Sequence, residues 1–137
     1  MGTPRWSQDV DLVANAPLKG VTNIVYSLHF YAGTHHQALR DKAQKALDKG
    51  LPLMVTEWGT VNADGNGAAN EAETRLWMEF LRKHKISHCN WALSAKNEGA
   101  SIFKVDVKPA ANYADTQLTP SGLIARHWVQ TWRELAQ

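Results

Sequence analysis

Three strand-like stretches alternate along this chain with three stretches of helical periodicity. The strand-like stretches are rich in β-branched, aromatic or uninterrupted apolar residues, and they cover residues 22–31, 53–57 and 86–93. Apolar residues then recur at helical spacing over residues 35–49, 70–85 and from 119 onward. Because parallel strands need long crossover connections, usually helices, this alternation predicts an α/β fold with helices packed outside parallel strands.

The predicted helices carry sequence signals at their ends. Gly50 stands where a helix commonly finishes in a left-handed conformation. Asn70 followed by Glu73 resembles an N-cap with a capping box, and Thr119 before Pro120 is typical of a helix start. The second helix is expected to end near Lys85.

Each predicted helix has an apolar face that is expected to pack against the sheet. The tryptophans on these faces are therefore interpreted as packing residues. The three faces consist of Ala38, Leu39, Ala43, Ala46 and Leu47, of Ala72, Leu76, Trp77, Phe80 and Leu81, and of Leu123, Ile124, His127, Trp128, Thr131, Trp132 and Leu135.

Two segments show neither period. Residues 1–22 are interrupted by Pro4 and Pro17, and residues 94–118 form a long polar stretch. Loops as long as the second segment are usually functional or mobile in a compact domain.

Composition narrows the class of protein. The chain has 137 residues, which fits one domain spanning 1–137, and 44% of them are hydrophobic. The net charge of +2 comes from interspersed residues, so no polybasic stripe indicates a nucleic-acid partner. No apolar run approaches the roughly 18 residues of a membrane helix, and the N-terminus lacks the apolar region of a signal peptide. Cys89 is the single cysteine and forms no internal disulfide.

Polar and aromatic side chains gather where the strand-like stretches end. These are His29 with Tyr31, Glu57 with Trp58, and Trp91 with Ser94. In parallel α/β folds, functional side chains collect at the carboxyl ends of the strands. A carboxylate after a buried strand costs several kcal/mol unless it is paired or used. Beside an aromatic wall, it is also what a glycosidase requires.

The residues alone leave a structural interpretation open beside the functional one. Glu57 fits a strand-end carboxylate paired with a neighbouring cation, and His29 fits a packed, hydrogen-bonded histidine. Lys96 and Glu98 fit solvated loop charges, and His35 with His36 fits helix capping or surface. The histidines show no metal-binding spacing, so the sequence predicts no metal and no cofactor.

Four motifs, in their order and spacing, resemble bacterial endoglucanases of glycoside hydrolase family 5. They span Gly2–Val10, Tyr26–Tyr31, Val55–Gly59 and Asn90–Leu93, and the likeness covers essentially the whole chain. The family folds as a (β/α)₈ barrel of ~250 residues or more. The resemblance therefore implies the C-terminal half of such a barrel, from the end of strand five through helix eight. Strands one to four would be absent, and with them the family's acid/base glutamate.

The resemblance also implies roles for particular residues. Glu57 would be the nucleophile of a retaining endo-1,4-β-glucanase (cellulase), and Tyr31 would donate a hydrogen bond to it. His29 would contact the substrate or the carboxylate pair. The remaining substrate-binding residues would be Trp91 stacked on the glycone-side sugar, Lys96 and Glu98 bonded to the next sugar, Ala63 contacting that sugar through its backbone, and Trp6 on the aglycone side.

Two functional hypotheses follow from the resemblance. One is a glucanase that hydrolyses a β-glucan, with cellulose, mixed-linkage glucan and mannan all left open; members of the parent family are secreted. The alternative is a catalytically crippled half-barrel, a structural or folding unit with residual glucan binding. A half-barrel exposes two sheet edges and an inner face expected to be apolar, so we expect a homo-oligomer.

Overall fold

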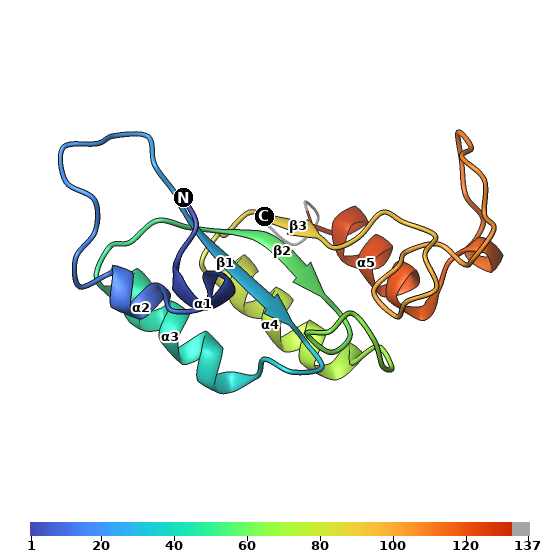
Figure 1. Ribbon diagram of the computed structural model, residues 1–137, viewed down its shortest axis with the longest axis horizontal. Helices are drawn as coiled ribbons and strands as arrows, with labels where there is room; N and C mark the ends of the chain where they lie inside the picture. Colours follow the sequence, from blue (N-terminus) through green and yellow to red (C-terminus); the bar gives the residue numbers. More distant parts are fainter. Residues whose placement is uncertain (133–137) are drawn as a thin grey trace.

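The computed structural model describes residues 1–132, which form a parallel three-stranded sheet in the order β1–β2–β3. The strands are β1 (Tyr26–Tyr31), β2 (Leu53–Gly59) and β3 (His88–Asn90). The long helices are α3 (Gln37–Asp48), α4 (Glu71–Lys83) and α5 (Pro120–Gln130). They follow the three strands in turn, which confirms the predicted α/β alternation (Figure 1).

The sheet is unequal across its width. β1 and β2 are paired along their whole length, from Tyr26 opposite Leu53 to Tyr31 opposite Gly59. β3 is paired with β2 at His88 and Asn90 alone. The strand predicted over residues 86–93 is thus reduced to three residues, in agreement with the polar residues His88 and Asn90 that interrupt its pattern.

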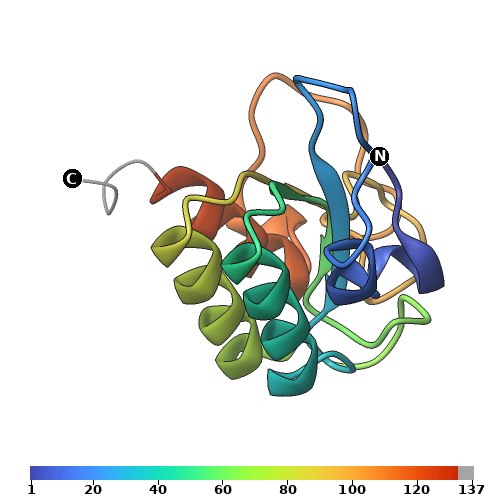
Figure 2. The ribbon, with the colours of Figure 1, turned by 90° about the vertical axis from the view of Figure 1, so that its left-hand side faces the viewer.

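Helices α3 and α4 lie side by side along one face of the sheet (Figure 2). Trp77 of α4 is completely buried and stacks on Phe30 of β1, with 4.1 Å between ring centroids. An ion pair between Arg40 and Glu73 joins the two helices. Trp77 and Trp128 are buried, and Trp132 packs edge-on against His88, so all three are packing residues as predicted.

The predicted helix ends are mostly confirmed. Asn70 Oδ1 accepts a hydrogen bond from Glu73 N at 3.0 Å, and Thr119 Oγ1 accepts one from Gly122 N at 3.0 Å. Gly50 has a φ of +77°, as a left-handed helix end requires. The capping box is not completed, because the Glu73 carboxylate pairs with Arg40 instead. Helix α4 ends at Lys83, two residues before the predicted end.

The apolar faces of the three long helices are only partly as predicted. The exposed members are Ala38 of α3, Ala72 and Leu76 of α4, and Leu123 and His127 of α5. Besides the predicted Trp128, helix α5 buries Ser121, Gly122 and Ala125. Small residues are needed there because a Cβ on Gly122 would lie 2.2 Å from the carbonyl oxygen of Ile102. Leu135 lies outside the described residues.

The N-terminal segment contains two short helical turns, α1 (Pro4–Ser7) and α2 (Val10–Val13), where the sequence predicted irregular structure. Before them, the chain runs beside the start of β1: Ser27 N donates to Met1 O at 2.8 Å, and Thr3 Oγ1 donates to Ser27 O at 3.1 Å. The long segment 94–118 is irregular as predicted, apart from the 3₁₀ turn η1 (Asp115–Gln117).

The sheet face that α3 and α4 leave open is not apolar, which corrects our expectation. Its accessible side chains include Ser27, His29, Thr56 and Cys89, because the apolar residues of β1 and β2 alternate toward the helices. Large exposed apolar side chains are found around β3 and α5, where Leu93 is 78% and Val129 57% exposed. They are also found in the N-terminal segment, at Met1, Trp6, Leu12, Leu18, Val21 and Val25. None of the described helices has the length and hydropathy to span a membrane.

Candidate active site

The site is organised around Glu57, which an irregularity in the sheet turns toward the open face. The register of β1 and β2 shifts between Leu28 and His29, so that Glu57 lies opposite His29. One extra residue changes the side-chain phase of a strand. Val55 and Trp58 both remain fully buried, while Thr56 and Glu57 between them both stay accessible. Strand β2 therefore places the Glu57 carboxylate on the open face while Val55 and Trp58 stay packed in the core.

Both carboxylate oxygens of Glu57 face side chains of β1, and one of them accepts a hydrogen bond. The Tyr31 hydroxyl donates to Glu57 Oε1 at 2.7 Å, and His29 Nδ1 lies 3.7 Å from Oε2. On its other side, His29 Nε2 is 2.8 Å from Thr56 Oγ1, which fixes the ring. No Lys or Arg within salt-bridge distance of Glu57 is found in the described part of the chain. The interpretation of Glu57 as one half of a strand-end ion pair with a neighbouring Lys or Arg is therefore wrong.

The electrostatics keep Tyr31 protonated. Burial, the hydrogen bond to Glu57 and the negative charges of Glu57 and Glu98 together raise the pKa of Tyr31 well above its usual value. A phenol that holds its proton remains a hydrogen-bond donor to the carboxylate over the whole physiological range. Glu98 contributes through its charge, so this residue of the 94–118 loop lies near the site.

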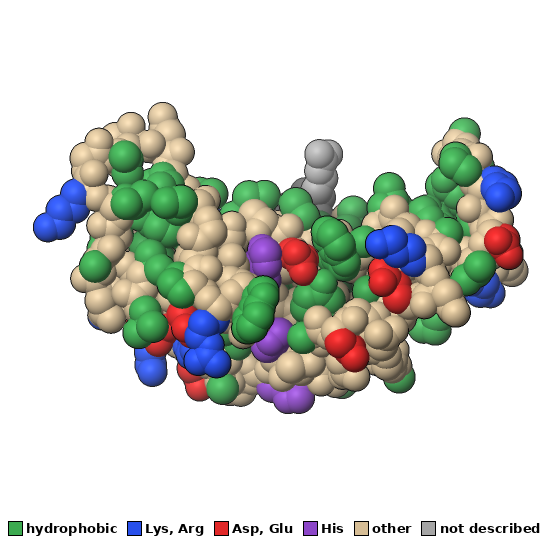
Figure 3. Space-filling view, in the orientation of Figure 1, with side chains coloured by type: hydrophobic (Ala, Val, Ile, Leu, Met, Phe, Trp, Pro, Cys, Tyr) green, Lys and Arg blue, Asp and Glu red, His purple; other side chains and the backbone are tan. Residues whose placement is uncertain are grey.

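Glu57 and its partners line a cleft of about 580 Å³. Figure 3 shows histidine and acidic side chains together in the middle of this face. The cleft is lined by Trp6, Gln8, His29, Tyr31, His35, Glu57, Ala63 and Asp64. Five of the eight residues proposed from the sequence, from four separate segments, therefore meet in one cleft.

Trp6 reaches the cleft from a strained turn. Arg5, Trp6 and Ser7 all have positive φ, between 52° and 61°. Left-handed backbone costs a residue with a side chain about 1–2 kcal/mol. Trp6 is 82% exposed, so burial of its own ring does not offset that cost. Strain kept at an exposed aromatic residue beside a cleft is typical of a binding site.

Three other proposed residues lie outside this cleft. Trp91 follows β3 directly, is about half exposed, and donates its backbone N–H to Trp58 O at 2.8 Å. Lys96 is exposed on the following loop. Glu98 lines a neighbouring cavity of about 560 Å³ between the loops at 66–71 and 97–99 and the start of α5.

Sequence reasoning missed Gln8, His35 and Asp64 as lining residues. The prediction of a capping or surface role suits His36, which is exposed at the N-cap position of α3, although its side chain makes no cap. It is wrong for His35, whose Nδ1 accepts a hydrogen bond from Tyr31 N at 2.8 Å. The sequence did contain a signal for His35, which was not used: it stands four residues after Tyr31, just beyond the strand end, where site residues gather.

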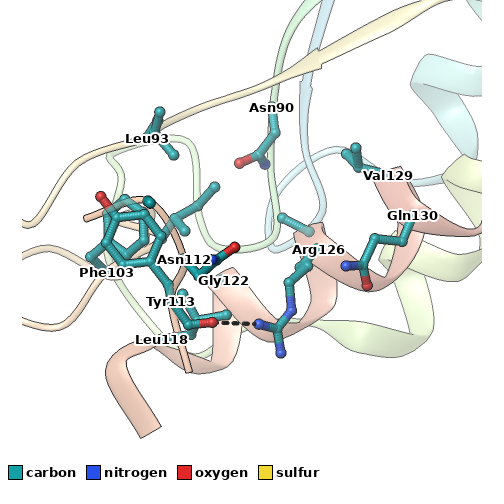
Figure 4. A pocket seen from close by; sticks show the side chains of 13 residues that line it. Asn90, Leu93, Phe103, Asn112, Tyr113, Leu118, Gly122, Arg126, Val129 and Gln130 are labelled. Carbon is teal, nitrogen blue, oxygen red and sulfur yellow. Dashed lines mark hydrogen bonds between the residues drawn. The ribbon is translucent and has the colours of Figure 1, made fainter. Parts of the chain in front are cut away.

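A second, apolar pocket of about 490 Å³ lies between α5 and the loop that follows β3 (Figure 4). Leu93, Phe103, Tyr113 and Val129 contribute to its walls, and Arg126 donates to Tyr113 O at 3.3 Å. Asn90 Oδ1 is buried without a hydrogen-bond partner among the described residues. Over residues 1–132, no group of three or more His, Cys, Asp or Glu side chains is arranged to hold a metal ion.

Comparison with known proteins identifies the family. The family model for cellulases, glycosyl hydrolase family 5, matches residues 1–97. Endoglucanase Z of Dickeya dadantii is 51% identical over 132 residues, and an endoglucanase of Clostridium saccharobutylicum is 45% identical over 126. These alignments cover 96% and 92% of this chain but only 29% and 28% of those relatives.

Solved structures agree. A structure from Cytophaga hutchinsonii is 48% identical, with a TM-score of 0.91. The match covers 98% of this chain and 44% of the Cytophaga chain. A glycosyl hydrolase family 5 cellulase from an Icelandic hot spring isolate is 35% identical with a TM-score of 0.88, covering 95% against 42%. This chain belongs to glycosyl hydrolase family 5. Family and structural neighbours imply a (β/α)₈ barrel, of which the described residues form a partial α/β fragment with a parallel sheet.

Proposed function

We propose that this chain carries the nucleophile side of an endo-1,4-β-glucanase site, with Glu57 as the nucleophile of a retaining reaction. The observation that carries the proposal is the hydrogen bond from the Tyr31 hydroxyl to Glu57 Oε1 at the open face of the sheet, with His29 Nδ1 3.7 Å from Oε2. A carboxylate held in this way is oriented for attack on an anomeric carbon. In this assignment, the Tyr31 hydroxyl orients the attacking carboxylate, and His29 fixes its other oxygen or contacts the substrate.

The proposed binding surface runs along the cleft and on toward β3. Trp6 lies against a sugar on the aglycone side, and Ala63 offers its backbone to a sugar on the glycone side. Trp91 stacks on the glycone-side sugar next to the cleaved bond, and Lys96 and Glu98 hydrogen-bond the sugar beyond it. Aromatic rings suit this role because the faces of pyranose rings carry apolar C–H groups.

A retaining glycosidase needs a second carboxyl group about 5–5.5 Å from the nucleophile. In the family this group is a glutamate at the end of barrel strand four, and we assign this chain to the half that runs from the end of strand five through helix eight. On this assignment, strand four would lie outside the 137 residues. Asp64 lines the same cleft and is the alternative donor within the chain.

We assign β-1,4-glucan as the substrate class because relatives that are 51% and 45% identical to this chain are named endoglucanases. A β-mannanase from Streptomyces thermolilacinus is 18% identical and shows the fold alone. A polymeric glucan is too large to cross a membrane unaided, so the proposed activity requires the protein to act outside the cell.

Self-association is a further part of the proposal. Parallel sheets normally have both faces and both edges covered. Here β3 ends the sheet beside the apolar pocket of α5, with Leu93 and Val129 exposed next to it. Two copies that cover these surfaces for each other would remove this apolar area from water. A larger-than-monomer mass by light scattering at micromolar concentration supports it, and a monomeric mass contradicts it.

The second candidate function is a structural or folding unit that retains glucan binding without hydrolysis. It is favoured because, within residues 1–132, Glu57 has no second glutamate beside it among the residues that line the cleft. Loss of one of two essential carboxylates typically costs several orders of magnitude in rate.

The experiment that separates the two candidates measures reducing ends released from carboxymethyl-cellulose. Wild type, Glu57→Gln and the control Glu79→Gln are compared; Glu79 is an exposed glutamate of α4 paired with Arg75. The glucanase proposal predicts hydrolysis by wild type and Glu79→Gln and none by Glu57→Gln. Hydrolysis that persists in Glu57→Gln contradicts the assignment of the nucleophile, and no hydrolysis by any of the three favours the second candidate.

A further inference from the structure

His35 is held rigidly at the start of the loop that joins β1 to α3. Its backbone N donates to Tyr31 O at 2.7 Å, and its backbone O accepts the Trp77 indole N–H at 2.7 Å. Trp77 is itself fully buried and stacked on Phe30. The position of His35 is thus set by the best-packed part of the molecule, although its ring lies at the wall of the cleft.

The hydrogen bond to Tyr31 selects one form of the ring. Nδ1 of His35 accepts from Tyr31 N at 2.8 Å, so Nδ1 carries no proton. Burial and the nearby His36 lower the pKa of His35, which keeps the ring neutral at neutral pH. In a neutral imidazole whose Nδ1 is an acceptor, Nε2 carries the proton. His35 is therefore a hydrogen-bond donor at Nε2.

That donor is available to a ligand. Nε2 of His35 makes no hydrogen bond to any residue in the described part of the chain, and it does not belong to the buried unpartnered atoms. The ring lines the same cleft as Glu57, Trp6 and Gln8. Since Nδ1 is turned to the β1 backbone, the opposite side of the ring, with Nε2, is the side that the cleft can use.

We propose that His35 is a substrate-binding residue that donates its Nε2–H to a hydroxyl or ring oxygen of a sugar bound beside Glu57. Its Nδ1 bond to the Tyr31 backbone holds the donor in place. Because Tyr31 also contacts Glu57, His35 and the nucleophile are aligned by the same strand end. The inference rests on the proposed function for the identity of the ligand, a β-1,4-linked glucan.

Two amide substitutions test the acceptor role of Nδ1 and the donor role of Nε2 separately. In His35→Asn the side-chain oxygen can take the place of Nδ1 as acceptor, but nothing replaces the Nε2–H donor. In His35→Gln the amide reaches the place of Nε2 as donor, but the acceptor for Tyr31 N is lost. His36→Gln is the matched control, because His36 is exposed next to His35 and does not line the cleft.

The experiment is a titration with cellotetraose followed by NMR of the histidine ring nitrogens and the Tyr31 amide. In free wild type, the His35 ring is expected in the Nε2–H form, and cellotetraose should shift its Nε2 signal. A lost neutral hydrogen bond corresponds to about three- to tenfold weaker binding. We expect that loss in His35→Asn with the Tyr31 amide signal unchanged, a smaller loss in His35→Gln with the Tyr31 signal shifted, and none in His36→Gln.

Three results would overturn the inference. They are an Nδ1–H ring in free wild type, wild-type affinity in a folded His35→Asn, or no binding of cellotetraose by wild type. If wild type does not bind cellotetraose, the hydrolysis assay shows whether the proposed function has failed as well. That assay changes Glu57 and leaves His35 as it is. Binding that is normal in His35→Asn alongside Glu57-dependent hydrolysis leaves the glucanase proposal standing and removes His35 from it.

Discussion

The β1–β2 side of the molecule and its β3–α5 side differ in strand pairing and in packing. On the first side, β1 and β2 pair from end to end and are covered by α3 and α4, with Trp77 and Phe30 stacked at the centre. On the second, a three-residue strand borders an apolar pocket, and Leu93 and Val129 are exposed. Glu57, Tyr31, His29 and His35 all lie on the first side. The candidate nucleophile is therefore positioned by a packed unit that does not depend on whether the β3 edge is covered.

The largest expected effect comes from removing the centre of the packed side. Trp77→Ala deletes a fully buried ring together with its bond to His35 O, its stack on Phe30 and the Arg40 guanidinium 5.2 Å from its centroid. We expect a loss of about 3–5 kcal/mol in the free energy of unfolding, measured in urea. Trp6→Ala removes the same side chain from an exposed site, and a comparable loss there would contradict the comparison.

The second effect concerns catalysis. Tyr31→Phe keeps the packing of the ring but removes the hydroxyl that donates to Glu57 Oε1. Hydrogen bonds to charged groups contribute about 1.5–3 kcal/mol, so hydrolysis should fall by about ten- to a hundredfold. Rates on carboxymethyl-cellulose measure it. Tyr113→Phe, on the pocket side, is the control and should be unchanged.

The third effect lies at the boundary of the two sides and depends on pH. The Trp58 indole donates to His88 Nδ1 at 3.0 Å, and burial with the charge of Arg82 lowers the pKa of His88 to about 4. A lowered folded-state pKa gives stability that is complete above the unfolded-state value near 6.5. That stability is lost as the pH falls from there to about 4.

After allowance for solvent screening of this partly exposed ring, the loss should be about 1–2 kcal/mol. Urea unfolding at several pH values measures it. His88→Gln should flatten the acid limb of the profile, while His127→Gln, at an exposed position of α5, should not. Equal pH profiles of the unfolding free energy for wild type and His88→Gln would contradict this role of His88 at the boundary of the two sides.

The smallest effect on the stability of one chain is expected at the apolar pocket. Val129→Glu places a charge on a side chain that is 57% exposed and should change unfolding by less than about 0.5 kcal/mol. It should nevertheless reduce self-association, which light scattering measures. Leu12→Glu, with the same exposed fraction but on α2, is the control. Association that survives Val129→Glu would place the contact elsewhere.

The sequence predicts features of this structure that depend on local chemistry. Asn70, Thr119 and Gly50 mark helix ends because capping and left-handed backbone are properties of single residues and their neighbours. The alternation of strands and helices is local in the same sense. The motif residues at the ends of β1 and β2 converge because parallel strands bring their carboxyl ends to one edge.

The features that sequence did not predict depend on contacts between distant segments. The sheet irregularity that sets Glu57 opposite His29 is a property of two strands together. His35 looks like a helix-start histidine until Tyr31 N supplies its Nδ1 partner. Leu123 of α5 is exposed because Gly122, its neighbour, must face the Ile102 carbonyl. The polar open face follows from the same side-chain alternation, and exposed apolar side chains lie instead in the N-terminal segment and around β3 and α5.

The central claim, that Glu57 is the nucleophile, is tested most directly by trapping a covalent intermediate. A fluorinated cellobioside with a dinitrophenolate leaving group needs no proton from the enzyme for the first step, so the test is independent of the acid/base carboxyl. The fluorine next to the anomeric carbon slows release of the sugar from the carboxylate. Mass spectrometry of peptides should find the fluorinated disaccharide on Glu57. Labelling of a different carboxylate, Asp64 for instance, or equal labelling of Glu57→Gln, would contradict the account.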